Sequence, residues 1–78
     1  MMTVKYIIEM THTTVLGEKS TYYYKGQDKK GVNCFTPNKR LASRYLSKDV
    51  ALRDTNILKA VHECKTDTFN VIDINCRI

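Results

Sequence analysis

The side chains best suited to chemistry in this 78-residue chain are its histidines and cysteines, and they form no recognisable motif. His12 and His62 fall in different predicted elements, and Cys34, Cys64 and Cys76 include no C-x-x-C pair. An odd number of widely spaced thiols is typical of reduced cysteines in a cytosol, where Cys packs as a small apolar residue. A metal site built on His62 and Cys64 is the alternative, but His-x-Cys lacks the ligand spacing of zinc motifs.

Catalysis has no candidate set of residues. No two carboxylates stand at a spacing that suggests acid–base work, and no nucleophile has a base nearby in the sequence. The sequence therefore predicts a protein that is not an enzyme, with no catalytic residues, no cofactor and no metal.

Positive charge gathers in one part of the chain. The segment from Lys25 to Arg53 holds eight Lys and Arg against two Asp, a net +6, whereas the remainder carries −1. Such a regional excess attracts nucleic acid or an acidic protein surface, and the alternative is a solvated surface that keeps a small protein soluble. The residues expected to contact a partner are Lys39, Arg40, Arg44 and Lys48, followed by Lys29, Lys30 and Tyr23.

Three consecutive tyrosines, Tyr22, Tyr23 and Tyr24, stand just before this basic segment. In a strand, Tyr22 and Tyr24 share one face and Tyr23 lies on the other. Two interpretations follow: cross-strand packing on a half-buried sheet, or an aromatic platform beside lysines that stacks on bases.

Alternating apolar residues predict the strands that would position these side chains. The predicted strands span Val4–Thr13, Thr21–Lys25, Val32–Phe35 and Phe69–Arg77. Gly17 marks a hairpin loop between the first two, and Lys65–Thr68 reads as a turn before the last.

A first helix is predicted directly after the third strand, with Thr36 as N-cap and Pro37 at its first position. Four residues recur at helical spacing and would form its buried face: Leu41, Ala42, Tyr45 and Leu46. Arg40 and Arg44 would then project together from the opposite face, and like charges at that spacing favour an anionic partner.

A second helix is predicted from Lys48 to about Cys64, capped by Ser47. Ala51, Leu58 and His62 would share one stripe, and an adjacent stripe holds Val50, Ile57, Val61 and Cys64. The residues expected to point mostly outward are Arg53, Asp54, Lys59 and Glu63. A strand from Ile57 onward is the alternative, because Thr55-Asn56 is a weak helical pair.

These elements predict a single α+β domain over residues 1–78: an antiparallel sheet of three or four strands with two helices packed on one face. No apolar run approaches the length of a membrane span, and the N-terminal apolar run is too short and too charged for a signal peptide. We therefore expect a soluble, cytoplasmic protein without a membrane partner; the oligomeric state stays open.

The pattern as a whole resembles small accessory proteins encoded in the early regions of phages of Gram-positive bacteria. The residues that carry the resemblance are the hairpin with Tyr22-Tyr23-Tyr24-Lys25-Gly26, then Phe35-Thr36-Pro37, then Ala42-x-x-Tyr45-x-Ser47-Lys48-x-x-Ala51, and a terminal strand. It covers most of the chain, but these are packing and capping positions, and no functional residue transfers with them. The resemblance implies the cytoplasm of an infected host and a role in counter-defence or host redirection, of which an anti-CRISPR is one example.

The functional prediction is a non-enzymatic phage-type inhibitor that binds a host protein or ribonucleoprotein through a basic face. The alternative is a small regulatory protein that binds nucleic acid, RNA more than DNA.

Overall fold

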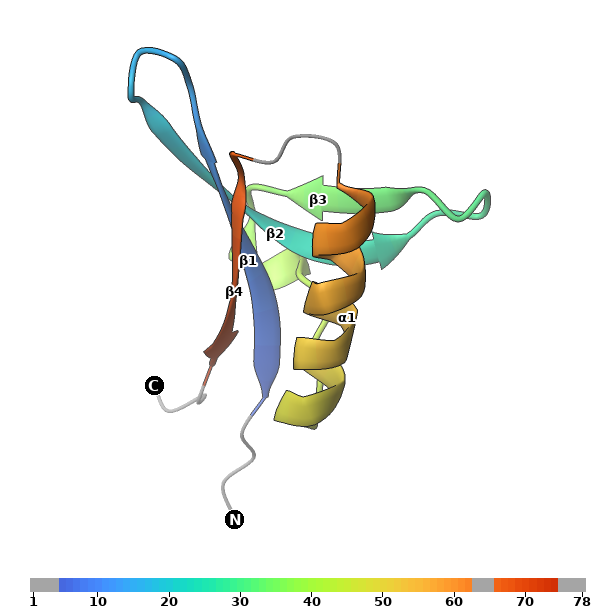
Figure 1. Cartoon of the computed structure of the whole chain (residues 1–78). Helices are drawn as coiled ribbons and strands as arrows, with labels where there is room; N and C mark the ends of the chain where they lie inside the picture. Colours follow the sequence, from blue (N-terminus) through green and yellow to red (C-terminus); the bar gives the residue numbers. More distant parts are fainter. Residues whose placement is uncertain (1–4, 63–65, 75–78) are drawn as a thin grey trace.

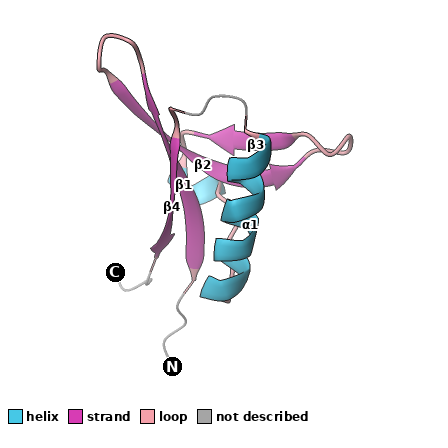
Figure 2. Ribbon diagram, in the orientation of Figure 1, coloured by secondary structure: helices cyan, strands magenta, loops and turns pink. Residues whose placement is uncertain are grey.

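The computed structural model describes residues 5–62 and 66–74. Its strands are β1 (Tyr6–Thr13), β2 (Lys19–Gln27), β3 (Asn33–Thr36) and β4 (Thr68–Asp73). They form one antiparallel sheet in the order β3-β2-β1-β4, so β3 and β4 are the edge strands (Figures 1 and 2). The α+β class is confirmed, and among the described residues the strand bounds differ from the predicted ones by one or two residues. Val4 of the first predicted strand and residues 75–77 of the last lie outside the described residues.

One α-helix, α1 (Lys48–Val61), crosses one face of the sheet (Figure 2). It begins where predicted, because the Ser47 side chain accepts a hydrogen bond from the Val50 N–H and caps its first turn. Ala51 and Leu58 lie on its buried stripe, at 0% and 4% exposure, and His62 follows as the C-cap. The predicted positions Glu63 and Cys64 lie outside the described residues.

The core lies between α1 and the sheet. Ile8 and Met10 of β1 pack there with Tyr24, Leu58 and Phe69. Tyr22 and Phe35 pack against this cluster from its margin, so the prediction that Tyr22 and Tyr24 share a face is confirmed. Burial of these side chains is the main term that holds so small a sheet together.

The prediction of two helices on one face is wrong. The first predicted helix is a single 3₁₀ turn, η1 (Lys39–Leu41), capped by Asn38 rather than Thr36. Ala42 is already extended, with φ −67° and ψ 146°, and Leu41 and Leu46 are 58% and 75% exposed instead of buried.

Backbone pairing explains why no helix continues through this segment. The Ser43 N–H donates to the Tyr24 carbonyl, and Tyr45 and Tyr6 exchange two 2.8 Å backbone hydrogen bonds. Residues 43–45 thus lie against β2 and against the start of β1, and only an extended backbone can make these bonds. The weak local helix preference of residues 42–46 is overridden by this tertiary pairing.

Candidate functional site

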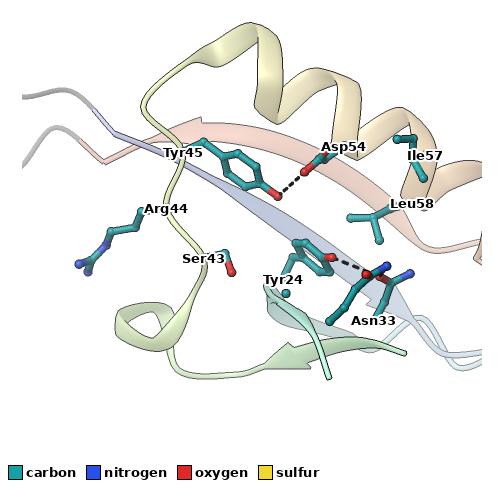
Figure 3. Close-up of a pocket in the computed structure, with 10 residues that line it drawn as sticks. Tyr24, Asn33, Ser43, Arg44, Tyr45, Asp54, Ile57 and Leu58 are labelled. Carbon is teal, nitrogen blue, oxygen red and sulfur yellow. Dashed lines mark hydrogen bonds between the residues drawn. The ribbon is translucent and has the colours of Figure 1, made fainter. Parts of the chain in front are cut away.

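A cavity of about 460 Å³ opens between α1 and the ends of β2 and β3 (Figure 3). Residues 43–45 form one wall, and Ile57 and Leu58 line it from the helix. Two hydrogen bonds join the elements around this cavity. The Tyr45 hydroxyl donates to Asp54 Oδ2 at 2.9 Å, and the Tyr24 hydroxyl donates to Asn33 Oδ1 at 3.2 Å. The predicted outward orientation of Asp54 is therefore wrong, since its carboxylate faces Tyr45.

Both phenols are held in the protonated form. Burial, followed by the hydrogen bond to Asp54, raises the pKa of Tyr45 well above its ordinary value. Burial also raises the pKa of Tyr24, with a smaller contribution from the Asp54 charge. Each phenol therefore acts as a hydrogen-bond donor that links two segments, and neither supplies a base near neutral pH.

A second cavity, of about 500 Å³, adjoins the first and shares Asn33 and Leu58 with it. Its walls are mostly apolar, and Val32 and Val61 on its rim are 56% and 59% exposed. Together the two cavities form a groove along α1 on the side of β3.

At the end of this groove, one carboxylate binds both histidines. Asp67 Oδ1 lies 2.7 Å from His12 Nδ1, and Asp67 Oδ2 lies 2.7 Å from His62 Nε2. The Asp67 side chain is only 5% exposed, whereas His12 and His62 are 41% and 23% exposed. Because an ionised carboxylate only accepts hydrogen bonds, each imidazole donates an N–H to it. The cluster joins β1, the end of α1 and the residue before β4.

The geometry of this cluster indicates a structural role, in which Asp67 links His12 to His62. Within the described part of the chain, neither His12 nor His62 hydrogen-bonds a hydroxyl or a thiol, the arrangement by which histidine activates a nucleophile. Among those same residues, no group of three His, Cys, Asp or Glu side chains is placed to hold a metal ion. Cys64, the other residue of the conceivable metal pair, and Cys76 lie outside the described residues.

The six cations expected to contact a partner are distributed over three segments. Lys29 and Lys30 lie in the turn between β2 and β3, which Figure 1 shows at the side of the domain, away from η1. Lys39 and Arg40 belong to η1, Arg44 follows it, and Lys48 is the first residue of α1. The structure therefore does not bring the six cations together on one face of a helix. The sequence had predicted such a face for Arg40 and Arg44, but no helix spans these two residues.

All six of these side chains are exposed, and within residues 5–62 and 66–74 none of them forms an ion pair. The Arg44 stem lines the first cavity, while its guanidinium points away from the cavity (Figure 3). Tyr23, the remaining candidate, is half-buried on the sheet face opposite Tyr22 and Tyr24, where its register partner is Thr36.

Sequence reasoning missed the Tyr45–Asp54 pair and the buried Asp67. Asp67 falls in a stretch that reads as a solvated turn, and its partners come from distant parts of the chain. No local pattern signals such a contact. For Asp54 the available signal was its position three residues after Ala51 and four before Leu58, which places it beside the buried stripe of α1.

No protein-family model matches this chain, and no curated protein or solved structure is detectably similar to it. The resemblance to phage accessory proteins therefore stays a prediction. Among the described helices, none is long and apolar enough to cross a membrane.

Proposed function

We propose that this protein is a non-enzymatic binding protein that attaches through its basic segment to an acidic surface of a host protein or ribonucleoprotein. In line with the resemblance, it would act in the cytoplasm of a phage-infected bacterium as an inhibitor of a host process, with counter-defence as one such role. The observation that carries this proposal is the set of six exposed cations without an ionic partner in the described structure.

Unpaired cations favour an anionic partner for a physical reason. A cation that already has an internal counter-ion gains little from a second one, whereas a solvated cation can still gain from an opposing charge. Lys29 with Lys30, and Lys39 with Arg40, are neighbouring like charges in short turns. A partner that carries carboxylates or phosphates would relieve their mutual repulsion and speed association.

The tyrosines favour a protein surface over single-stranded nucleic acid. Tyr24 is 8% exposed, and Tyr22 packs against the same core, so neither ring offers a face for base stacking. Tyr23 alone remains half-exposed on the other face. Stacking on successive bases needs several accessible rings, and one half-buried ring does not supply them.

The test is affinity capture from a lysate of a Gram-positive bacterium, with and without nuclease, using the unmodified protein and Arg40→Glu/Arg44→Glu. We expect a protein partner that survives nuclease and is lost with the charge-reversed variant. Because an ionic interface is screened, the complex should also weaken as salt rises.

The matched control is Lys5→Glu/Lys19→Glu, which changes the net charge by the same amount outside the basic segment. Circular dichroism should show that both variants keep the fold. Equal loss in the two variants would mean that net charge alone matters and would refute the proposed segment. Loss of every partner after nuclease treatment would mean that the protein binds nucleic acid and not a protein surface.

A further inference from the structure

The cavity of about 460 Å³ between α1 and the ends of β2 and β3 is acidic inside (Figure 3). Among the described residues that line it, Asp54 is the only acid and Arg44 is the only cation. Figure 3 shows the Arg44 guanidinium pointing away from the cavity, whereas the Asp54 carboxylate accepts the hydrogen bond of Tyr45 in the cavity wall. The Asp54 side chain is 33% exposed, so a ligand in the cavity can reach it. The charge that such a ligand meets is therefore negative, although the chain as a whole carries +5.

The hydrogen bonds already made around the cavity leave several acceptors available. The Tyr45 hydroxyl donates to Asp54, and the Tyr24 hydroxyl donates to Asn33. Both phenol oxygens can therefore only accept a further hydrogen bond. The Gln27 amide nitrogen donates to the same Asn33 oxygen at 3.2 Å, which leaves the Gln27 carbonyl oxygen as another acceptor.

The Asp54 carboxylate itself keeps capacity for a ligand. Its Oδ2 accepts from Tyr45, while its Oδ1 lies 3.7 Å from Nε of Arg53, whose side chain is 69% exposed. A surface ion pair of this kind contributes little, so a better-placed cation can compete with it. Donors are present at the cavity too, on the Ser43 hydroxyl and the Asn33 amide nitrogen, but the one ionised group inside is an acceptor.

This set of groups matches a guanidinium. A guanidinium is always charged, presents several N–H donors in one plane and has no acceptor. Asp54 can neutralise its charge, and the phenol and amide oxygens can accept its remaining N–H groups. An ammonium ion is more strongly hydrated and offers its donors from a single point, so it loses more on entering a cavity. The Asp54 charge disfavours an anion.

The rest of the wall suits the stem that carries a guanidinium in arginine. Ile57, which is 55% exposed, and Leu58 line the cavity from α1, and an aliphatic stem can pack along them. The half-buried Tyr45 ring adds an aromatic surface, which attracts a guanidinium. The cavity volume also lies in the range of roughly 300–1,000 Å³ that is usual for small-ligand sites.

We propose that this cavity binds the side chain of an arginine from a polypeptide, with Asp54 as its counter-ion and the oxygens of Tyr24, Tyr45 and Gln27 as further acceptors. The donors of Ser43 and Asn33 would bind the peptide carbonyls beside that arginine. This inference does not rest on the proposed function, because it concerns an acidic cavity and not the basic segment.

The test is titration of the purified protein with N-acetyl-arginine methylamide, followed by proton–nitrogen correlation NMR. We expect saturable shifts of the backbone signals of Ser43, Tyr45 and Ile57, and none at the distant turn that holds Val15. The citrulline analogue of the same compound is a neutral isostere and should bind about tenfold more weakly, because it lacks the charge. Propylguanidine carries the charge without peptide groups and should also bind more weakly than the capped arginine.

Asp54→Asn removes the charge, while its amide oxygen can still accept the Tyr45 hydrogen bond. It should weaken binding of the capped arginine about tenfold. Asp49→Asn is the matched control, since it makes the same change of charge at an exposed position of α1 that does not line the cavity. The NMR spectra of both variants show whether the fold is kept.

Arg53→Gln supplies a second test, which does not depend on the folding of the Asp54 variant. It removes the internal competitor for Asp54 Oδ1 and should tighten binding roughly twofold. Lys39→Gln makes the same change of charge in η1, outside the cavity, and should leave binding unchanged.

Four results would overturn the proposal. The first is the absence of saturable shifts at the cavity, and the second is equal binding of the arginine and citrulline compounds. The third is an equal loss of binding in Asp54→Asn and Asp49→Asn. The fourth is propylguanidine that binds as tightly as the capped arginine, because the ligand would then be a small guanidinium compound and not a polypeptide.

Discussion

The Tyr45 hydroxyl and the Asp54 carboxylate, 2.9 Å apart, join the extended segment after η1 to the middle of α1. The same tyrosine pairs through its backbone with Tyr6 at the start of β1. One residue thus connects the sheet, the loop and the helix. The contact also forms one wall of the cavity in Figure 3, so the shape of the groove depends on it.

Tyr45→Phe removes the hydroxyl and leaves the Asp54 carboxylate without this donor. We expect the free energy of unfolding to fall by about 1–2 kcal/mol, the usual cost of losing such a hydrogen bond. Urea denaturation followed by circular dichroism measures it. Asp54→Asn and the double variant complete a cycle, and additive losses in that cycle would contradict a direct coupling between the two side chains.

Alkaline pH should destabilise the protein through Tyr45. Its pKa is raised in the folded state, so folding disfavours the phenolate; the stabilising contribution is complete below the unfolded pKa of about 10 and is lost as pH rises above it. Tyr45→Phe should make the alkaline decline in the free energy of unfolding shallower. Tyr23→Phe, on the opposite sheet face, is the control, and a shallower decline there as well would refute the assignment to Tyr45.

Asp67→Ala should loosen the link between β1 and the end of α1. The substitution removes a buried acceptor that holds both His12 and His62, and we expect a loss of about 1–3 kcal/mol in the free energy of unfolding. Asp73→Ala, at an exposed position of β4, is the matched control and should have little effect. His12→Ala should lower the free energy of unfolding much less in the Asp67→Ala background than in the unmodified protein. An equal loss in both backgrounds would contradict the contact between His12 and Asp67.

Gly26→Ala should cost more than Gly31→Ala. Both glycines have positive φ, +99° and +83°, so both substitutions carry backbone strain of about 1–2 kcal/mol. At Gly26 the new Cβ also meets Ser43 Oγ at 3.3 Å, whereas nothing lies within 4 Å at Gly31. Thermal unfolding of the two variants gives the difference, and Ser43→Ala should reduce it. Equal losses of stability in the two variants would mean that the close approach of residue 43 to β2 does not add to the cost of Gly26→Ala.

Local signals in the sequence were sufficient for most of the sheet and for α1. Alternating apolar residues predicted the strand that became β1, and Ile8 and Met10, two residues apart in it, both pack in the core. Ser47 ahead of Lys48 predicted the start of α1, and the cap is present at that position. Such signals succeed because strand alternation and helix capping depend on residues close together in the chain.

The error over residues 37–46 has the opposite cause. Leu41, Ala42, Tyr45 and Leu46 have helical spacing, yet Leu41 and Leu46 face solvent. Backbone hydrogen bonds to Tyr24 and Tyr6 decide the conformation, and their donors and acceptors lie far away in the sequence. Spacing within a ten-residue window carries no information about them.

By itself, the sequence determined the α+β class, the faces of the strands, the start of the helix and the concentration of positive charge between Lys25 and Arg53. Only the tertiary structure decided where those charges lie, that Asp67 binds both histidines, and that Asp67 and His62 line a cavity together with apolar side chains of α1 and β3. The physical reason is the distance along the chain over which each effect acts. Propensity, alternation and capping act over a few residues, whereas these features arise from contacts between segments that only folding brings together.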